Sequence, residues 1–386
     1  MIKLSNKTRK QIYLHIGFEK TGSTSIQKYF STYSSQLEKA GVFYLADKKN
    51  KLVYDETHWP MAAMLAKNNK FVPPSKHFAL DDAKKYVSEA LDSTKCEKII
   101  FSAEPFSSML LDRGRIKALK EIFGDSDVKI LAYIRRQDGF FLSHISNYVK
   151  GGQVIVLSKE MTLEGTGICY ENGERYDYKH ILSMWSDVFG RENMIVRRFE
   201  PSALKGKDVV VDALDVLGVD CSDLPVSTRA NKRLPVDTLL FLNLLNAGAL
   251  PALLGGYRAR VIDSLTLYPS KRPRQQLISN QLRRKIIEYY DQRNMEVASL
   301  YLGADGPLFM SPLPDEDAAW KPVYPLIPKE ILDLTIHLHQ AIPEVSERIV
   351  RSLCRPMHGK GPKYLWAQRQ LLPAYAEVII GSRFDE

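Results

Sequence analysis

The sequence predicts an α/β protein: a central parallel β-sheet flanked by helices, followed by a helical C-terminal extension. Short apolar runs rich in β-branched and aromatic residues alternate with segments of helical periodicity, which is typical of parallel sheets with right-handed crossovers. The first run leads into a glycine-containing loop that resembles a phosphate-binding loop. After Trp320 the pattern is helical, with several prolines and no clear strand. We therefore expect an α/β domain over 1–320 and a helical extension over 321–386.

The composition fits a folded protein with anionic partners. The chain has 386 residues, of which 45% are hydrophobic, so it can bury a sizeable core. Its net charge of +9 favours nucleotides, acidic polysaccharide or a membrane surface as partners, and a merely basic surface is the alternative. The four cysteines show no metal-ligand spacing, so we expect no metal site and a reduced, cytoplasmic setting.

No segment reads as a membrane anchor. Glu19 and Lys20 interrupt the apolar run after the basic N-terminus, so it does not resemble a signal peptide. The most apolar segment, 239–254, is short and contains asparagine, glycine and proline, which favours a buried helix and loop. Peripheral contact with the inner face of the membrane is left open.

The first elements predict a βαβ unit. Residues 12–16 are an apolar strand, Ile26 to Leu37 show helical spacing, and Gly41 can end that helix before a second strand at 42–45. Residues 46–80 are polar and irregular, include His58, and are expected to form an insertion.

The next strands carry polar residues at their ends. Residues 98–104 are a strand with Glu104 at its end, and 128–134 are an apolar strand that runs directly into Arg135. In open parallel sheets ligands bind at the carboxyl ends of strands. The first loop, Glu104 and Arg135 are therefore expected at one crevice.

The rest of the chain alternates in the same way as far as residue 320. We expect helices at 81–91, 119–123, 138–150, 178–189, 210–218 and 277–302, a strand at 194–199, and a loop or lid at 150–175.

The loop from Gly17 to Thr24 is a candidate anion site. It places backbone N–H groups at a helix N-terminus, where the helix dipole favours negative charge. Its spacing nearly matches G-x-x-x-x-G-K-[ST], but Ser23 occupies the lysine position and the lysine of the loop is Lys20. This argues against an ATP–Mg²⁺ phosphotransferase, which we keep as an alternative.

Two stretches together resemble a known family. The stretch Lys20-Thr21-Gly22-Ser23-Thr24-Ser25 resembles the 5′-phosphosulfate loop of sulfotransferases that use 3′-phosphoadenosine-5′-phosphosulfate (PAPS). Arg135 and Ser143, eight residues apart after a buried strand, resemble the pair that binds the 3′-phosphate. The phrase 14–27 and later short motifs, up to about residue 320, are similar to the bacterial carbohydrate sulfotransferase branch, whose fold is P-loop-like.

The resemblance implies a function and a set of roles. The sulfuryl group would pass from PAPS to a hydroxyl, less often an amine, of a carbohydrate or glycolipid, without a metal. Lys20 would stabilise charge on the bridging oxygen. Glu104 is the first candidate for the general base, with the cap of the next helix as its structural alternative, and His58 is the competing base.

A non-catalytic polyanion-binding protein on the same fold is the other alternative. No interleaving of aromatic and basic residues supports nucleic acid as a partner. The resemblance implies that Asn231, Lys232 and Arg233 could contact the adenosine or the 3′-phosphate, and a solvated basic loop is the alternative.

Overall fold

The structure is a computed structural model that describes residues 10–68, 72–155, 173–220, 224, 234–248, 255–270, 272, 277–318, 325–353 and 362–384. The chain divides into two compact units, each assembled from several segments. The first contains Met1–Phe140, Leu163–Ala230 and Lys285–Leu313, and the second contains Phe141–Thr162, Asn231–Arg284 and Pro314–Glu386.

The first unit is built on a five-stranded sheet in which every neighbouring pair is parallel. The strand order is β2-β3-β1-β4-β5. The strands are β1 (Gln11–His15), β2 (Val42–Tyr44), β3 (Lys98–Ser102), β4 (Asp127–Ile134) and β5 (Met194–Arg198). This confirms the predicted α/β fold with a central parallel sheet.

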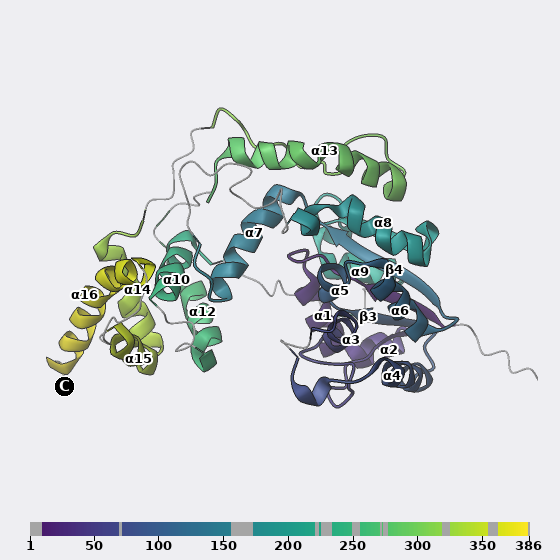
Figure 1. Cartoon of the computed structure of the whole chain (residues 1–386), viewed down its shortest axis with the longest axis horizontal. Helices are drawn as coiled ribbons and strands as arrows, with labels where there is room; N and C mark the ends of the chain where they lie inside the picture. The colour runs from purple at the N-terminus through teal and green to yellow at the C-terminus, as the bar shows by residue number, and fades with distance from the viewer. Residues whose placement is uncertain are drawn as a thin grey trace, which may run out of the picture. The chain divides into compact units, whose positions relative to one another are not determined.

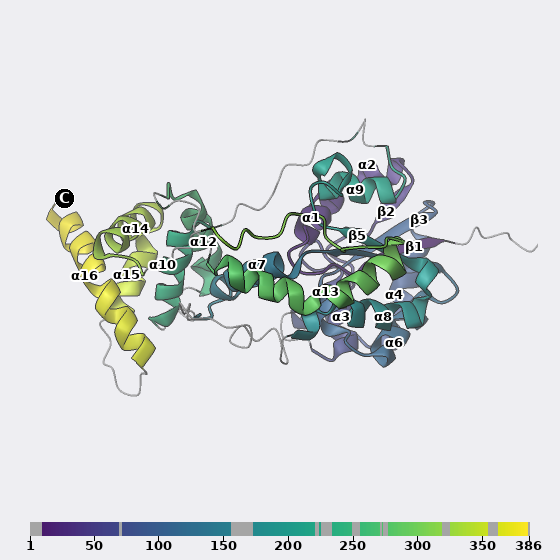
Figure 2. The same ribbon diagram turned by 90° about the horizontal axis from the view of Figure 1, so that it is seen from above.

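Helices cover both faces of this sheet, which explains why its central strands are almost continuously apolar. The helices and helical segments of the first unit are α1 (Ser23–Thr32), α2 (Ser34–Lys39), α3 (Trp59–Ala66), α4 (Leu80–Asp92), α5 (Pro105–Met109), α6 (Arg113–Phe123), α8 (Tyr178–Phe189), α9 (Val209–Val216), the start of α7 (Gln137–Lys150) and most of α13 (Asn280–Leu302). α1, α2 and α9 share one core with the sheet, whereas α3, α4, α6 and α8 lie on the opposite face (Figure 2).

The predicted irregular insertion at 46–80 contains a helix. Trp59 begins α3, Pro60 occupies its first turn, and Met61, Ala62 and Leu65 are buried. Proline is compatible with the first turn of a helix, where its missing N–H costs nothing. The prediction missed α3 because an eight-residue helix gives too few turns for a clear period.

The second unit is helical. It contains α10 (Val236–Ala247), α12 (Arg258–Leu267), α14 (Pro328–Ala341), α15 (Pro343–Leu353) and α16 (Pro362–Phe384), together with the end of α7 and the start of α13 (Figure 1). Leucines of α10 and α14 and Tyr375 of α16 form its core. The predicted helical C-terminal region is therefore present, while the boundary at residue 320 stays a prediction.

Side-chain hydrogen bonds within the second unit cap the C-terminal end of α7. The guanidinium of Arg258 donates to the carbonyls of Val149 (2.9 Å) and Lys150 (2.5 Å), and the Asn246 amide donates to Val149 (2.8 Å) and Gln153 (2.9 Å). These donors satisfy carbonyls that a helix leaves unpaired at its C-terminus.

In the described part of the chain, no helix has both the length and the apolar character needed to cross a bilayer.

Candidate functional site

The loop between β1 and α1 reverses direction through left-handed backbone positions. Gly17, Lys20 and Gly22 have φ values of +40°, +67° and +83°. Glycine adopts such angles at little cost, whereas lysine rarely does, so the conformation at Lys20 is held by its surroundings. A side-chain β-carbon at Gly22 would lie 2.7 Å from Val209 of α9, so glycine also permits close packing there.

Side chains from the loop and from α5 fix its shape. The Ser107 hydroxyl donates to the Gly17 carbonyl at 2.5 Å, and the Thr21 hydroxyl donates to the Phe18 carbonyl at 2.5 Å. The Ile16 amide donates to Leu131 of β4 at 3.0 Å. The loop is therefore anchored to the neighbouring strand and to the element that follows β3.

The loop ends at an open helix N-terminus. Gly22 is the N-cap of α1, and in the described structure no side chain caps this end. Ser23 is buried, Ser25 is half-buried and Thr24 is exposed. The first turn of a helix presents N–H groups and positive potential, so the arrangement can hold an anion.

Glu104 lies directly against this loop. It follows β3 at the N-cap position of α5, but its side chain makes no capping hydrogen bond, which argues against the structural alternative. A β-carbon on Gly17 would lie 2.9 Å from the Ser23 hydroxyl and 3.3 Å from Glu104 Cγ. The absence of a side chain at Gly17 thus lets Ser23 and Glu104 approach each other.

The environment of Glu104 raises its pKa to about 7. Burial is the largest cause, and the nearby charge of Glu19 acts in the same direction. The charge of Lys20 and the hydroxyl of Ser23 act against it. The sequence left the sign of this balance open, and in the structure burial dominates.

Arg135 reaches the loop from the end of β4. Its guanidinium donates to the Lys20 carbonyl at 3.3 Å and lies over the Phe199 ring, 5.9 Å from the centroid. A β-carbon on Gly139 would meet its Nε at 3.0 Å, so the side chain lies against the first turn of α7. The loop, Glu104 and Arg135 therefore meet at one edge of the sheet, as expected.

Ser143 lies farther along α7, where the chain belongs to the second unit. It is half-buried. Its pairing with Arg135 stays a prediction.

His58, the competing base, is buried in the core of the first unit. Its Nδ1 accepts from the Ser102 amide at 3.0 Å, and its ring packs between Tyr44 and Phe101. Burial lowers its pKa to about 4. These contacts fit a structural role that joins the start of α3 to the end of β3.

A buried polar cluster lies beneath the loop. The Ser102 hydroxyl bonds His15 Nδ1 at 2.7 Å and accepts from the Gln27 amide at 3.0 Å. Burial lowers the pKa of His15 to about 4. The cluster ties the ends of β1 and β3 to α1, and His15 is a buried histidine of the core.

Sequence reasoning missed a second segment that touches the loop. Arg175, in the 3₁₀ turn Gly173–Tyr176, pairs with Glu19 at 3.3 Å, and the Tyr178 hydroxyl donates to the Arg135 carbonyl at 2.5 Å. The Tyr178 ring also meets Phe18 edge to face, at 5.0 Å between centroids. This segment is more than 150 residues from the loop and has no motif, although the helical stripe that begins at Tyr178 was visible.

Two polar residues that follow β4 and β5 form internal contacts. Arg136 pairs with Asp138 at 2.8 Å and donates to the carbonyls of Ser311 and Pro312. Glu200 is buried and accepts from the amides of Met310 and Ser311. Both side chains therefore hold the segment around residue 311 within the first unit.

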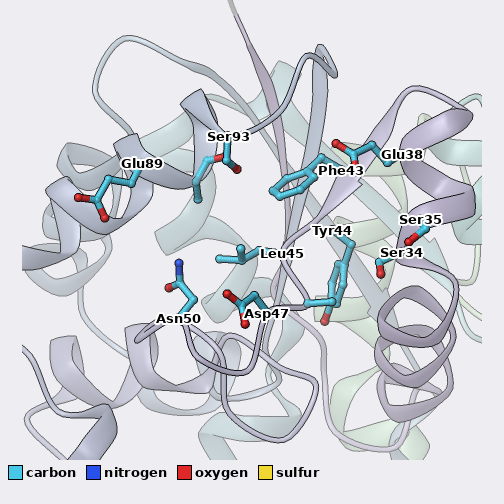
Figure 3. A pocket seen from close by; sticks show the side chains of 12 residues that line it. Ser34, Ser35, Glu38, Phe43, Tyr44, Leu45, Asp47, Asn50, Glu89 and Ser93 are labelled. Carbon is cyan, nitrogen blue, oxygen red and sulfur yellow. The ribbon is translucent and has the colours of Figure 1, made fainter.

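A cavity of about 320 Å³ lies elsewhere in the first unit. It runs beside the edge strand β2 and is lined by α2, the residues after β2 and the end of α4 (Figure 3). None of the predicted site residues lines it.

Some predicted features lie outside the described residues. These are Asn231, Lys232 and Arg233, and most of the expected loop at 150–175. Among the described residues, no three His, Cys, Asp or Glu side chains gather as metal ligands would.

The chain shows little similarity to known proteins. No protein-family model and no curated protein matches the sequence. Among solved structures, a sulfotransferase from Alicyclobacillus acidocaldarius is 20% identical and has a TM-score of 0.37. The match covers 63% of this chain and 94% of that one. A likeness of this degree does not establish a family or an activity for this chain.

Proposed function

We propose that this chain is a PAPS-dependent sulfotransferase that transfers the sulfuryl group to a hydroxyl, less often an amine, of a carbohydrate or glycolipid. One observation carries the proposal. The loop with Lys20 and the uncapped N-terminus of α1, a carboxyl group of raised pKa, and Arg135 meet at the carboxyl edge of a parallel sheet. This edge is where open α/β sheets bind ligands.

The residues fit the two anionic ends of the donor. The N-terminus of α1 and residues Lys20 to Ser25 would hold the 5′-phosphosulfate. Arg135 would hold the 3′-phosphate, since a guanidinium matches phosphate geometry, and Ser143 would add its hydroxyl.

The reaction is an in-line displacement at sulfur. The acceptor oxygen forms a bond to sulfur while the bond between sulfur and the 5′-phosphate oxygen breaks, and adenosine 3′,5′-bisphosphate leaves. Charge grows on the leaving oxygen, where Lys20 and the loop N–H groups stabilise it. The acceptor's proton passes to Glu104.

Glu104 suits the role of base better than His58 does. A base is most effective when its pKa lies near the working pH, and the pKa of Glu104 is raised to about 7. His58 is completely buried, and its Nδ1 is bound to the backbone of β3. We therefore assign the proton transfer to Glu104.

The composition and the resemblance support a proposed setting. We place the protein in the cytoplasm, with carbohydrate or glycolipid as acceptor, peripheral contact with the inner membrane face as an option, and no nucleic-acid partner. The ATP–Mg²⁺ phosphotransferase and the non-catalytic polyanion-binding protein remain as rivals that the following test separates.

The test is calorimetric titration of the protein with adenosine 3′,5′-bisphosphate and, separately, with ATP–Mg²⁺. We expect binding of the bisphosphate and weaker binding of ATP–Mg²⁺. Arg135→Ala should weaken bisphosphate binding by about 10- to 100-fold, the usual loss of a charged hydrogen-bond partner. Arg113→Ala is the matched control, because Arg113 forms an exposed pair with Asp187.

Turnover separates an enzyme from a binding protein. Glu104→Gln should bind the bisphosphate normally and lose about 10²- to 10⁴-fold in sulfate transfer from PAPS to extracted glycans. Absence of bisphosphate binding would overturn the proposal. Preference for ATP–Mg²⁺ would favour the phosphotransferase, and salt-dependent polyanion binding alone would favour the non-catalytic protein.

A further inference from the structure

A second carboxylate stands next to the proposed base. Glu19 directly precedes Lys20 in the loop, and one oxygen of its carboxylate lies 3.3 Å from Nη1 of Arg175. The pair is partly open to solvent, since the Arg175 side chain is 37% exposed and the Glu19 side chain 22%. Neither residue has a role in the transfer described above.

The position of Arg175 is fixed by its neighbours. The next residue, Tyr176, is buried, and its carbonyl accepts from the Gln137 amide at 3.2 Å. Two residues further on, Tyr178 bonds the Arg135 carbonyl and packs on Phe18. These contacts of the neighbouring tyrosines fix the backbone at Arg175, and its ion pair with Glu19 orients that carboxylate.

Glu19 is two residues from Gly17, against which Glu104 packs, and it lines a small pocket together with Arg175 and with Ser107, three residues after Glu104. The charges that act on the Glu104 carboxyl are those of Glu19 and Lys20. An acceptor whose hydroxyl reaches Glu104 must therefore also come close to the Glu19 carboxylate. A like charge at such a place repels, and hydroxyl or ammonium groups can donate hydrogen bonds to it.

Building on the proposed function, we propose that Glu19, positioned by Arg175, selects acceptors by charge. It favours a neutral or cationic sugar and disfavours a sugar with an anionic group beside the reacting hydroxyl. Glu19 is then a specificity-determining residue and Arg175 a positioning residue.

Arg175 suggests a competing interpretation. Its guanidinium could leave Glu19 and bind a carboxylate or sulfate on the acceptor. That arrangement predicts the opposite preference, namely for anionic sugars. The proximity of Glu19 to Glu104 favours the first interpretation.

The test uses three acceptors that differ in charge. Methyl glucoside, methyl glucosaminide and methyl glucuronide are each supplied with PAPS at about pH 8, where Glu104 is largely ionised, and release of adenosine 3′,5′-bisphosphate is measured. The wild-type protein should use the glucoside or glucosaminide with a higher kcat/KM than the glucuronide. Equal or better use of the glucuronide would overturn the inference.

Variants then assign the effect to the pair. Glu19→Gln should raise the glucuronide-to-glucoside ratio of kcat/KM by about tenfold, the effect of removing one nearby like charge. Arg175→Gln should lower that ratio, because Glu19 loses its partner. A purely structural role of the pair would move both variants in the same direction, and this outcome also overturns the inference.

Glu174→Gln is the matched control. Glu174 precedes Arg175 in the same turn and is exposed, so the same change of charge there should leave the ratio unchanged.

Bisphosphate binding by wild type and by every variant separates a failure of the proposed function from a failure of this inference. If wild type does not bind the bisphosphate, the proposed function fails. If it binds but all three sugars are inert, or the ratio does not change in Glu19→Gln, only this inference fails.

Discussion

At the scale of single residues, Glu104 shows how opposing effects set one proton affinity. The burial of its carboxyl and the nearby charge of Glu19 favour the neutral form, while Lys20 and Ser23 favour the ionised form. The balance leaves the pKa at about 7, so a modest change of environment switches the group between acid and base. A carboxyl of this kind can take a proton at neutral pH.

The pH dependence of turnover tests this assignment. The value of kcat/KM for PAPS reports the groups of the free enzyme, so it should rise about tenfold per pH unit below pH 7 and level off above it. A base at His58, whose pKa is lowered to about 4, would give a flat profile across the same range. Initial rates between about pH 5 and pH 9 with one acceptor distinguish the two, and a flat profile would remove Glu104 as the base.

How far single residues could be predicted depended on their place in the chain. Glu104 and Arg135 could be placed at one edge of the sheet because each follows a buried strand, and parallel strands bring their ends together. Arg175 could not be placed near the loop, since its contact with Glu19 spans 156 positions. His58 could not be placed either, because its burial depends on Tyr44 and Phe101, which the sheet brings around it.

At the scale of elements, strands were easier to predict than short helices. β1, β3 and β4 are buried along almost their whole length, and such runs stand out in a sequence. The helix α3 did not stand out, because almost all of its residues are apolar and it has no polar face to create a period. The start of α3 is instead set by His58, which is buried at the N-cap, and by Pro60, whose ring restricts the backbone in the first turn.

The loop between β1 and α1 depends on the missing side chain of Gly17. In Gly17→Ala the new methyl group would lie 2.9 Å from the Ser23 hydroxyl and 3.3 Å from Glu104 Cγ, so the loop and Glu104 must separate. We expect a loss of turnover of about tenfold with a smaller loss of bisphosphate binding, because turnover depends steeply on the position of a reacting group. Both quantities come from initial rates and calorimetry.

Gly41→Ala serves as the control for backbone strain. Gly41 also has a positive φ, +85°, but a β-carbon there would meet nothing within 4 Å. Both variants pay the strain of a left-handed alanine, of about 1 kcal/mol, and only Gly17→Ala adds the contact with Glu104. Equal turnover in the two variants would show that the approach of Glu104 to the loop is unimportant.

At the scale of the whole molecule, some of the basic side chains form bonds within the protein. In the second unit, Arg258 caps α7, Arg272 pairs with Glu330 at 2.5 Å, and Arg260 pairs with Glu344 at 2.8 Å. The net charge of +9 suggested an anionic partner, but it does not say where the excess charge lies, and Arg258 shows that an arginine with no ion pair among the described residues can serve a bond to the backbone. The local geometry around Lys20 and Arg135 therefore argues for an anionic ligand more strongly than the total charge does.

Buried histidines should govern how stability depends on pH. Burial lowers the pKa values of His15 and His58 to about 4, below their value of 6.5 in an unfolded chain. The unfolded state therefore binds more protons below pH 6.5, and stability falls as the pH decreases from about 6.5 to 4. Glu104 acts in the opposite direction, because its raised pKa makes its contribution largest below about 4.5 and removes it as the pH rises through 7.

Two histidines outweigh one carboxyl, so the first unit should lose stability on acidification. Each histidine lowers the free energy of unfolding by on the order of 3 kcal/mol between about pH 7 and pH 4.

In His58→Asn the amide oxygen can still accept from the Ser102 amide but does not titrate, so the fall in the urea midpoint between pH 7 and pH 5 should be smaller than in wild type. His180→Asn, at an exposed position in α8, should keep the wild-type fall. The decisive quantity is the change with pH and not the absolute stability, because the substitution at a buried site also lowers stability at every pH. An equal fall in His58→Asn and wild type would mean that His58 does not titrate on unfolding.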